Sequence, residues 1–266
     1  MTSLFDLAAG ATVYDLAQPY FVGMPHYPTH PPFSFSLTRG HGEYPGPEGH
    51  GSSAEAIALG GHVGTHIDAL CHFSYRGKLY GGIAVEQSTA SGHGQLTVDT
   101  IAPILRRGVL LDIAGLAGVS ALEEDFEVTP AHLDAGARGL EIRPGDVVLL
   151  RTGWASSFRE PVRFLAQGRG PGPSLAGARW LSGRGVFAAG SDTLAFEKIP
   201  MPAMPVHVHL LVEKGIHIIE CLNLEELAAA GVREFLFVAA PLKIRGATGA
   251  PMRPLALYLA PAVADR

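Results

Sequence analysis

The segment at residues 60–72, GGHVGTHIDALCH, concentrates the side chains with the clearest chemical potential in this sequence. It places His62, His66, Asp68 and His72 within eleven residues, among three glycines and one threonine. Imidazole nitrogens and carboxylate oxygens without a thiolate suit Zn²⁺ or Mn²⁺, and Fe²⁺, Co²⁺ and Ni²⁺ accept similar donors. The density of these side chains therefore predicts a site for a divalent metal ion rather than a set of unrelated hydrogen-bonding histidines.

Either regular backbone conformation brings these four side chains together. All four have even numbers, so an extended chain projects them from one face, whereas a helix makes each pair spaced four residues apart neighbours. The three glycines disfavour a continuous helix. We expect a strand end that turns at Gly64 into a short helix from about Thr65. Gly64 is also expected to leave room for an ion between two ligands.

A second concentration of metal-ligand types spans residues 205–220, PVHVHLLVEKGIHIIE. Glu220 closes an apolar run that should form a buried strand, where a carboxylate is costly unless it is paired or bound to a cation. His207 and His209 lie two residues apart at a predicted helix start, so they point about 200° apart and only one should face the metal. Their spacing does not choose between them. Glu213 is expected to be solvated, and His217 fits either a strand face or a ligand position.

Other standard sites are absent from the sequence. It contains no G-x-S-x-G nucleophile motif, no G-x-x-x-x-G-K-[ST] phosphate loop, no H-E-x-x-H and no C-x-x-C. A net charge of −5, from 20 basic and 25 acidic side chains without a dense basic run, argues against nucleic acid as a partner. The two cysteines are expected to be free thiols.

The sequence shows no membrane or secretion signal. Its apolar runs stay well short of the roughly 18 residues that a membrane-spanning helix needs. Residues 1–11 lack a cationic start followed by a long apolar stretch, which is the pattern of a secretory signal. We therefore expect a cytoplasmic protein without a membrane partner.

The elements that must position the chemical groups alternate after residue 95. Helices are predicted at 98–106, 174–182, 206–214 and 224–230. Strands are predicted at 109–113, 146–151, 186–189, 216–220 and 235–239, with a turn at 143–145. The first ninety residues are expected to form long loops, rich in Gly, Pro and His, with short extended runs. This alternation indicates an α/β fold with a mixed sheet and flanking helices, and the absence of a linker favours one domain over residues 1–266.

The segment at 60–72 resembles the H-x-G-T-H-x-D-x-x-x-H signature of the cyclase family of metal-dependent hydrolases, which includes kynurenine formamidase and isatin hydrolase. The likeness extends through YDL at 14–16, GMP at 23–25, GSDT at 190–193 and the segment 215–222. The proline that usually stands between the aspartate and the last histidine is replaced by Leu70, which we expect to change only packing. The resemblance implies a fold of the swivelling β/β/α type.

The resemblance also implies a role for each candidate residue. The implied metal ligands are His62, His66, Asp68, His207 and Glu220. Asp68 would bridge to a second ion, and His72 matches the catalytic histidine of the family. The distal histidine of relatives falls on Val208 here, and the alignment of the block favours His207 over His209. Tyr27 stands where relatives often have an aromatic residue that packs on the substrate, although a buried loop aromatic explains it equally well.

These roles predict hydrolysis of a small molecule. A divalent ion lowers the pKa of its bound water from about 15.7 toward 7 and polarises a carbonyl group. With His72 as the proton carrier for the leaving nitrogen, one or two Zn or Mn ions would cleave the C–N bond of an amide, formamide or lactam, on an isatin- or formylkynurenine-like substrate. The alternatives are a dienelactone-type lactone hydrolase and a catalytically inactive homologue that binds a metal or small molecule. The apolar composition and the long N-terminal loops favour a homodimer or larger oligomer.

Overall fold

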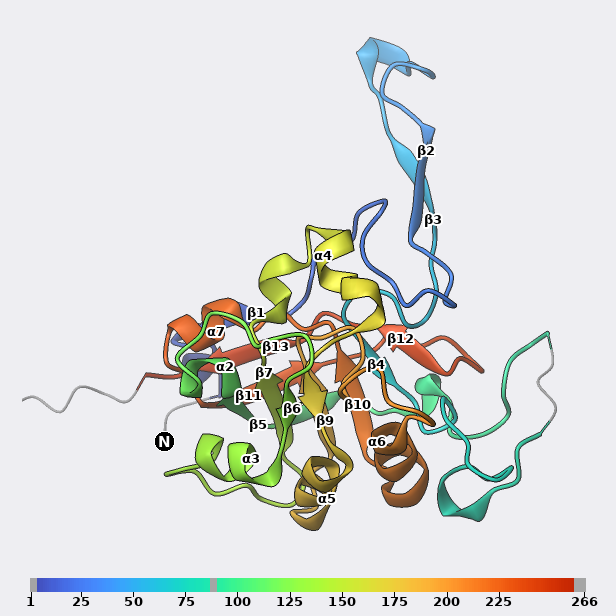
Figure 1. The fold of residues 1–266 in the computed structure, drawn as a ribbon. Coiled ribbons are helices and arrows are strands. Elements are labelled where there is room, and N and C mark those ends of the chain that lie inside the picture. Colours follow the sequence, from blue (N-terminus) through green and yellow to red (C-terminus); the bar gives the residue numbers. More distant parts are fainter. Residues whose placement is uncertain (1–3, 87–89, 261–266) are drawn as a thin grey trace, which may run out of the picture.

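One large mixed sheet organises the computed structural model, which describes residues 4–86 and 90–260 (Figure 1). Its nine strands lie in the order β1, β13, β11, β5, β7, β9, β10, β4, β12. The strands β5, β7, β9 and β10 run parallel at the centre, and antiparallel strands extend the sheet on both sides. In sheet order the bounds are Thr12–Asp15, Leu255–Tyr258, Glu234–Ala239, Ile104–Asp112, Val147–Arg151, Ala188–Ser191, His217–Glu220, His66–Asp68 and Gly249–Pro251. This architecture confirms the predicted α/β fold with a mixed sheet.

Short helices and two small sheets complete the described part of the chain. The α-helices α1 to α7 are Leu4–Ala9, Ile113–Leu116, Pro130–Gly136, Pro161–Leu165, Leu175–Gly183, Pro205–His207 and Glu225–Ala229. A π-helical stretch, Val208–Lys214, continues α6. The 3₁₀ turns are Pro47–Gly49, Tyr80–Gly82, Val98–Thr100, Trp154–Ser157 and Ala166–Gly168. The small sheets pair β2 (Ser34–Arg39) with β3 (Ala54–Ala58) and β6 (Glu127–Val128) with β8 (Gly172–Pro173). The expected domain over 1–266 also includes residues 1–3, 87–89 and 261–266, which lie outside the described part.

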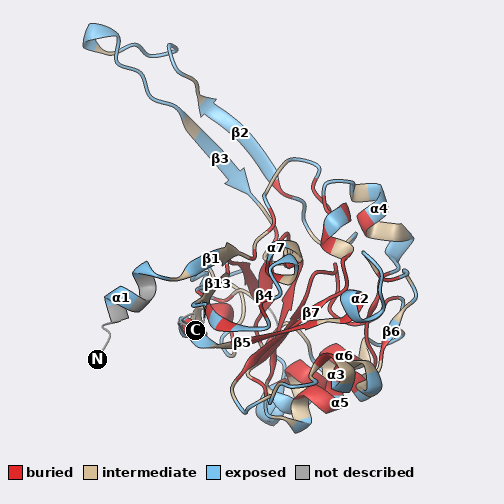
Figure 2. Cartoon of the chain, turned by 90° about the vertical axis from the view of Figure 1, so that its left-hand side faces the viewer, coloured by how far each residue is buried: buried red, intermediate tan, exposed pale blue. Residues whose placement is uncertain are grey.

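The central strands carry buried apolar runs because both faces of the sheet are covered where these runs lie. In β7, Val147 and Leu149 pack into one core cluster, whereas Val148 and Leu150 pack into the cluster on the opposite face. The helices α3, α5 and α6 lie together on the second face, and α7 contributes to the first (Figures 1 and 2). Parallel strands with both faces buried read as continuous apolar runs, which explains the strands recognised in the sequence.

Most of the elements predicted after residue 105 are present. The predicted helices at 174–182 and 224–230 correspond to α5 and α7, and the five predicted strands correspond to β5, β7, β9, β10 and β11. The predicted helix at 206–214 is helical but changes from α to π geometry after His207, and it ends at Gly215, whose φ is 66°. The predicted helix at 98–106 is wrong. Pro103 disfavours helix at its own position and the one before it, and residues 104–106 pair with β11 instead.

The predicted short helix after Gly64 is also wrong. Residues 66–68 form strand β4, which lies between β10 and β12 and forms antiparallel ladders with both. Two strand neighbours satisfy the backbone of this segment, so the pairing outweighs its local turn preference. Gly64 has a positive φ of 63°, and a Cβ atom there would lie 2.7 Å from the Tyr20 ring and 2.9 Å from Met24. The space at Gly64 therefore accommodates these two side chains and not an ion.

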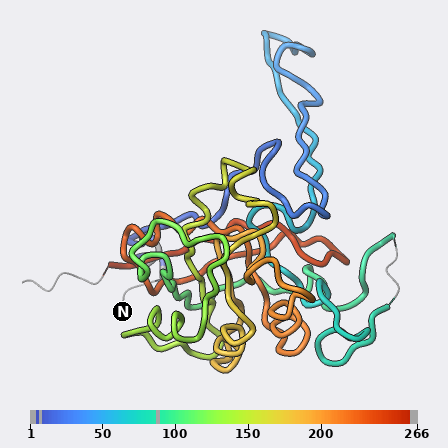
Figure 3. The backbone as a smooth tube through the Cα atoms, viewed as in Figure 1, coloured from blue at the N-terminus to red at the C-terminus, as the bar shows by residue number. Residues whose placement is uncertain are grey.

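A long hairpin formed by β2 and β3 leaves the main body of the molecule. Figures 1 and 3 show its two legs running side by side away from the large sheet. Figure 2 shows that both strands are exposed almost throughout. Of the helices in the part that the structure describes, none has the length and apolar character needed to cross a membrane.

Candidate active site

Two neighbouring strands present the first set of polar side chains. In β4, His66 and Asp68 project from one face of the sheet, and Ile67 packs into the core on the other. Strand β10 places Glu220 directly opposite His66 in the antiparallel register, so the Glu220 side chain joins the same face. All three polar side chains are almost completely buried. The alternation of side chains along a strand thus gathers two predicted ligands of the first segment with the distal carboxylate.

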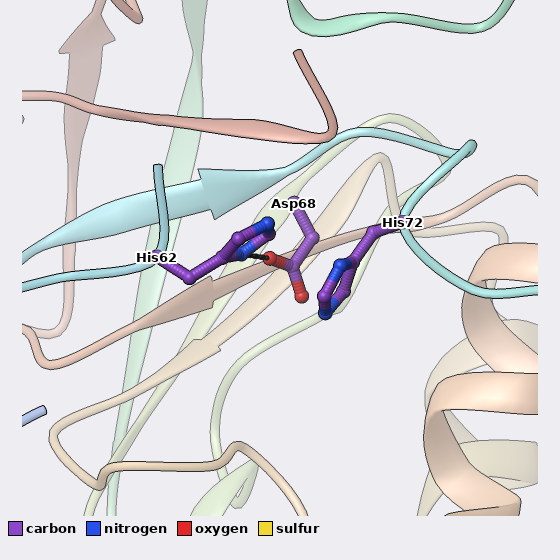
Figure 4. Close-up of side chains that lie close together, drawn as sticks. All are labelled: His62, Asp68 and His72. Atoms are coloured by element: carbon purple, nitrogen blue, oxygen red, sulfur yellow. Dashed lines mark hydrogen bonds and ion pairs between the residues drawn. The ribbon is translucent and has the colours of Figure 1, made fainter. Parts of the chain in front are cut away.

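The turns that flank β4 bring in the two remaining histidines of the segment. Figure 4 shows Asp68 lying between His62, which comes from the turn before the strand, and His72, which follows the strand. Nδ1 of His62 donates to Oδ1 of Asp68 over 2.8 Å. The rings of His62 and His72 stack with their centroids 3.9 Å apart. Ligand atoms of these three residues lie within 4.8 Å of one another, which is the spacing of a possible metal site.

The end of α6 contributes His207 to a second group of the same kind. Its Nε2 atom lies 3.4 Å from Oε1 of Glu220 and 3.9 Å from Oδ2 of Asp68. These three residues again place their ligand atoms within 4.8 Å, so Asp68 belongs to both groups. The two groups together with His66 form a continuous cluster, called here the His/carboxylate cluster: His62, His66, Asp68, His72, His207 and Glu220.

The other histidines of the second segment lie outside this cluster. His209 bonds through Nε2 to the Ser182 hydroxyl at 2.8 Å and through Nδ1 to Glu213 at 2.7 Å. His217 lies on the opposite side of β10 from Glu220 and donates from Nδ1 to the Asp68 carbonyl oxygen at 2.8 Å. The structure thus brings His207, and not His209, to the cluster. The Glu213 side chain is half exposed, as the sequence indicated.

The cluster has the donor set and the unpaired atoms that a divalent cation requires. Nε2 of His66 and Oδ2 of Asp68 are buried without a hydrogen-bond partner. Nε2 of His66 also lies 3.6 Å from Oδ1 of Asp68 and 3.4 Å from Oε2 of Glu220. Buried polar atoms are nearly always paired, and nitrogen and carboxylate oxygen are the donors that Zn²⁺ and Mn²⁺ accept. The residues present therefore fit a divalent metal ion.

Mutual electrostatics keep the acids of the cluster ionised. Burial acts to raise the pKa of Asp68, but the adjacent imidazoles of His72 and His62 outweigh it and hold this pKa well below its usual range. Burial likewise opposes ionisation of Glu220, yet the imidazoles of His207 and His66 lower its pKa to about 2. The cluster thus holds two carboxylate charges inside the protein, which is costly without a cation beside them.

The histidines of the cluster divide into two kinds. Burial acts to lower the pKa of His207, but its contacts with Glu197 and Glu220 raise it to about 10. The pKa of His66 is also raised, because nearby carboxylates outweigh its burial. Burial dominates at His72 and lowers its pKa to about 4, so this imidazole is neutral at pH 7. In the metal-free protein, therefore, His207 is an imidazolium that offsets part of the charge of the acids, whereas His72 is neutral.

A cavity of about 250 Å³ opens onto the cluster. Polar atoms of the cluster form part of its wall, and the rest is largely apolar or aromatic. The lining residues from outside the cluster are Tyr27, Thr29, His30, Phe73, Leu194, Ala195 and Met204. Tyr27 therefore stands at the cavity, where the sequence had left open a substrate contact or a buried loop position. A cavity of this size and composition suits a small, mostly apolar molecule.

Three residues near the cluster were not singled out from the sequence. Glu197 bonds to His207, and the hydroxyl of Thr248 lies 2.9 Å from Nε2 of His62. His30 lines the cavity with its ring centroid 5.3 Å from that of His62. Thr248 and His30 lie far in sequence from His62, and Glu197 lies ten residues before His207, so only the proline-rich segment PTHPP around His30 offered any sequence signal.

The two cysteines are free thiols, as the sequence predicted. Cys71 precedes His72 and Cys221 follows Glu220, but neither belongs to a group with metal-ligand geometry among the described residues. Burial raises the pKa of the Cys71 thiol to about 11 and that of Cys221 well above its usual value. Both thiols therefore stay protonated at neutral pH and act as small apolar groups.

Known proteins are similar to this chain in sequence. The Cyclase family model matches residues 14–198. An isatin hydrolase of Roseibium aggregatum is 30% identical over 213 residues, which cover 76% of this chain and 73% of that protein. A kynurenine formamidase of Bacillus cereus is 25% identical over 243 residues, which cover 90% of this chain and 94% of that protein.

Solved structures agree with the sequence comparison. The crystal structure of a novel cyclase matches with a TM-score of 0.86 and 29% identity, over 95% of this chain and 88% of that one. Isatin hydrolase A from Ralstonia solanacearum matches with a TM-score of 0.76 and 28% identity, over 97% of both chains. Because the family model covers more than half of the sequence, and the fold matches along nearly the whole chain, the protein belongs to the cyclase family of hydrolases.

Proposed function

We propose that the protein is a metal-dependent hydrolase that cleaves the C–N bond of a small amide, formamide or lactam. The observation that carries this proposal is the pair of buried, unpartnered ligand atoms, His66 Nε2 and Asp68 Oδ2, in a cluster that opens onto the cavity. The isatin hydrolase and kynurenine formamidase relatives support the choice of bond. An isatin- or formylkynurenine-like molecule is the substrate class that we propose.

The metal would be Zn²⁺ or Mn²⁺, bound as one or two ions. The proposed ligands are His62, His66, Asp68, His207 and Glu220. Bound there, a divalent ion supplies Lewis acidity and an activated water. Asp68 belongs to both groups with ligand geometry, and this supports the proposal that it would serve a second ion as well as the first.

His72 is the proposed proton carrier, and Tyr27 the proposed substrate contact. His72 lines the cavity beside Asp68 and is neutral because burial lowers its pKa to about 4. In this role it would accept a proton from the attacking water and deliver it to the leaving nitrogen as the C–O bond forms and the C–N bond breaks. Tyr27 and Phe73 line the same cavity and offer aromatic surfaces for a planar substrate.

A hydrolysis screen on metal-free and reloaded protein tests the proposed activity. The protein is stripped with a chelator, reloaded with Zn²⁺ or Mn²⁺, and given an isatin, an aryl formamide, a cyclic imide and a lactone. We expect turnover of at least one C–N substrate that appears only after reloading. Turnover of the lactone alone would reassign the protein to ester chemistry, and bound metal without turnover of any substrate would make it a binding homologue.

The His72→Ala variant separates a proton carrier from a ligand. His72 lies close enough to His62 and Asp68 to bind an ion, so activity alone does not distinguish the two roles. We expect this variant to keep its metal, measured by elemental analysis, and to lose turnover by about 10²–10⁴-fold. Loss of the metal would instead make His72 a ligand. Near-normal turnover with the metal retained would exclude both roles.

We also infer that the protein forms a homodimer through the β2–β3 hairpin. Phe35, Leu37 and Ile57 are 46–62% exposed on this hairpin, and Phe35 pairs directly with Ile57. An isolated two-stranded hairpin is marginally stable in water, so an apolar arm of this kind gains stability when it is covered. A second copy carries the same arm, and a twofold axis lets each copy cover the arm of the other.

A further inference from the structure

The carboxylate of Glu197 lies directly behind the proposed ligand His207. Its side chain is completely buried, and it comes from the loop between β9 and α6. Oε1 of Glu197 accepts a hydrogen bond from the Nδ1 atom of the His207 ring at 2.6 Å and from the His207 backbone N–H at 2.9 Å. One oxygen atom therefore holds both the main chain and the ring of the same residue.

The segment that carries Glu197 is fixed in its turn. Ile199 exchanges two backbone hydrogen bonds with Gly170, and Lys198 donates to the Pro173 carbonyl oxygen. The backbone at Glu197 packs closely on Gly172. A Cβ atom added at Gly172 would lie 2.4 Å from the carbonyl carbon of Glu197. The carboxylate consequently approaches His207 from a rigid support.

This arrangement selects one tautomer of His207. Because Nδ1 keeps its proton for the bond to Glu197, the neutral ring that binds a metal carries its lone pair on Nε2, which faces Glu220 at 3.4 Å and the unpartnered Oδ2 of Asp68 at 3.9 Å. Histidines that bind metals commonly donate their second ring N–H to a carboxylate, which fixes ring orientation and makes the ligating nitrogen more basic. A helix cap alone would not require a fully buried charge, since a neutral side chain caps equally well.

We propose that Glu197 is the positioning residue of the metal site, which holds the His207 ring with Nε2 directed at Asp68 and Glu220. This inference rests on the proposed function, because it takes His207 as a metal ligand. Glu197 acts through His207 and touches neither the metal position nor the substrate cavity. Its loss should therefore weaken metal binding without removing any ligand.

The test compares Glu197→Gln with a matched buried acid. Asp146→Asn is the control, because Asp146 is also buried and accepts a backbone N–H from Arg143 at 2.8 Å and a side-chain bond from Arg107 at 2.7 Å. It precedes the first residue of β7 and thus lies at the opposite end of the parallel strands from Glu220. The dissociation constants for Zn²⁺ and Co²⁺ are measured by competition with a chelator, together with the visible spectrum of the Co²⁺-loaded protein.

We expect Glu197→Gln to weaken ion binding about 10–100-fold and to change the Co²⁺ spectrum, while Asp146→Asn leaves both as in the wild type. Wild-type affinity and an unchanged spectrum in Glu197→Gln would overturn the positioning role. His207→Ala separates this failure from that of the proposed function. If His207→Ala binds ions as tightly as the wild type, His207 is not a ligand, and the metal assignment fails together with the role of Glu197.

Nitrogen-15 NMR of the wild type keeps the proposal testable if Glu197→Gln does not fold. In the Zn²⁺-loaded protein, the His207 ring should carry its proton on Nδ1, with a strongly deshielded N–H signal from the short bond to the carboxylate. A proton on Nε2 of His207 would overturn the proposal without any substitution.

Discussion

Asp68 is the residue on which the two halves of the site depend. Oδ1 bonds to His62, and the unpartnered Oδ2 faces His207 at 3.9 Å. The backbone carbonyl oxygen of Asp68 also accepts a hydrogen bond from Nδ1–H of His217, which ties β4 to β10. A carboxylate in this position joins candidate ligands that are supplied by a turn, a strand and a helix.

Replacing Asp68 with Asn should therefore remove metal binding. The change keeps the size of the side chain but deletes the charge that both ligand groups share. We expect less than stoichiometric Zn²⁺ or Mn²⁺ after dialysis and a loss of hydrolysis of at least about 100-fold, since ligand loss should exceed the usual cost of losing a supporting residue. Elemental analysis gives the metal content, and Asp99→Asn, outside the cluster and bonded to Thr97 and Gly246, is the control. Full metal occupancy in Asp68→Asn would contradict the assignment.

Metal binding should release protons from the cluster. At pH 7 the metal-free protein has a protonated His207, because its pKa is about 10, and an imidazolium cannot bind an ion. We expect about one to two protons to be released per chain. The apparent affinity for the ion should then fall about tenfold for each unit by which the pH is lowered, for each proton displaced. Calorimetric titrations in buffers of different ionisation enthalpy measure this number. The absence of any buffer dependence would show that the cluster is already deprotonated.

The same group makes the metal-free fold sensitive to alkaline pH. The pKa of His207 rises from 6.5 to about 10 on folding, so the stability it contributes is complete below pH 6.5 and is lost as pH rises toward 10. The melting temperature of metal-free protein should fall over this range. The His207→Gln variant should lack the share of this fall in melting temperature that is due to His207. The control variant His209→Gln, which changes the imidazole two residues away, should retain it.

At the scale of elements, the site depends on how β4 begins. The sequence indicated the candidate ligands of this segment because they are close together in the chain, but the helix that it predicted after Gly64 is absent. Local glycine content favoured a turn, whereas pairing with β10 and β12 decided the conformation. Glu197 had no such signal, because its partner His207 becomes a neighbour only after the loop between β9 and α6 has folded.

Gly64→Ala tests the entry into β4. The φ of 63° disfavours any side chain, and the added Cβ would lie 2.7 Å from the Tyr20 ring, whose hydroxyl bonds to the carbonyl oxygens of Val63 and Thr65. Gly77 also has a positive φ, of 71°, but with no atom within 4 Å of an added Cβ. We expect Gly77→Ala to cost about 1 kcal/mol of unfolding free energy, from backbone strain alone.

The clash at Gly64 should add to this backbone cost. We expect Gly64→Ala to lose about 1–3 kcal/mol more than Gly77→Ala, because the overpacked Tyr20 must shift. Urea denaturation of both variants measures the difference, and metal content reports on the ligands that follow the turn. Equal stability of the two variants would show that the contact with Tyr20 relaxes without cost.

At the scale of the whole molecule, apolar runs predicted the strands at the centre of the mixed sheet, whereas no local pattern in the sequence indicated the strands at its edges. Strands β7, β9 and β10 and the second half of β5 are buried on both faces and so appear as short apolar runs. The edge strands β1 and β12 have four and three residues, and each pairs with one neighbour distant in sequence. Their place in the sheet follows from the folded core and not from a local pattern.

The hairpin formed by β2 and β3 connects the outer surface of the molecule with its cavity. Its first leg follows His30 and its second leg precedes His62, so both ends of the arm lead directly into the cavity wall. If a second copy covers the arm, the same contact steadies the loops on which these two histidines lie. The proposed dimer therefore concerns the geometry of the site as well as the stability of the arm.

The double substitution Phe35→Ser and Leu37→Ser should convert the protein to a monomer. It removes the two large apolar side chains of β2 from a hairpin that is exposed in the single chain, without touching the main core. Light scattering at micromolar concentration should give twice the chain mass of 28.0 kDa for the wild type and the single mass for the variant. Val162→Ser is the control, because Val162 is 89% exposed on α4, away from the arm. A wild type with the mass of one chain, or a double variant that remains dimeric, would show that the hairpin does not hold two copies together.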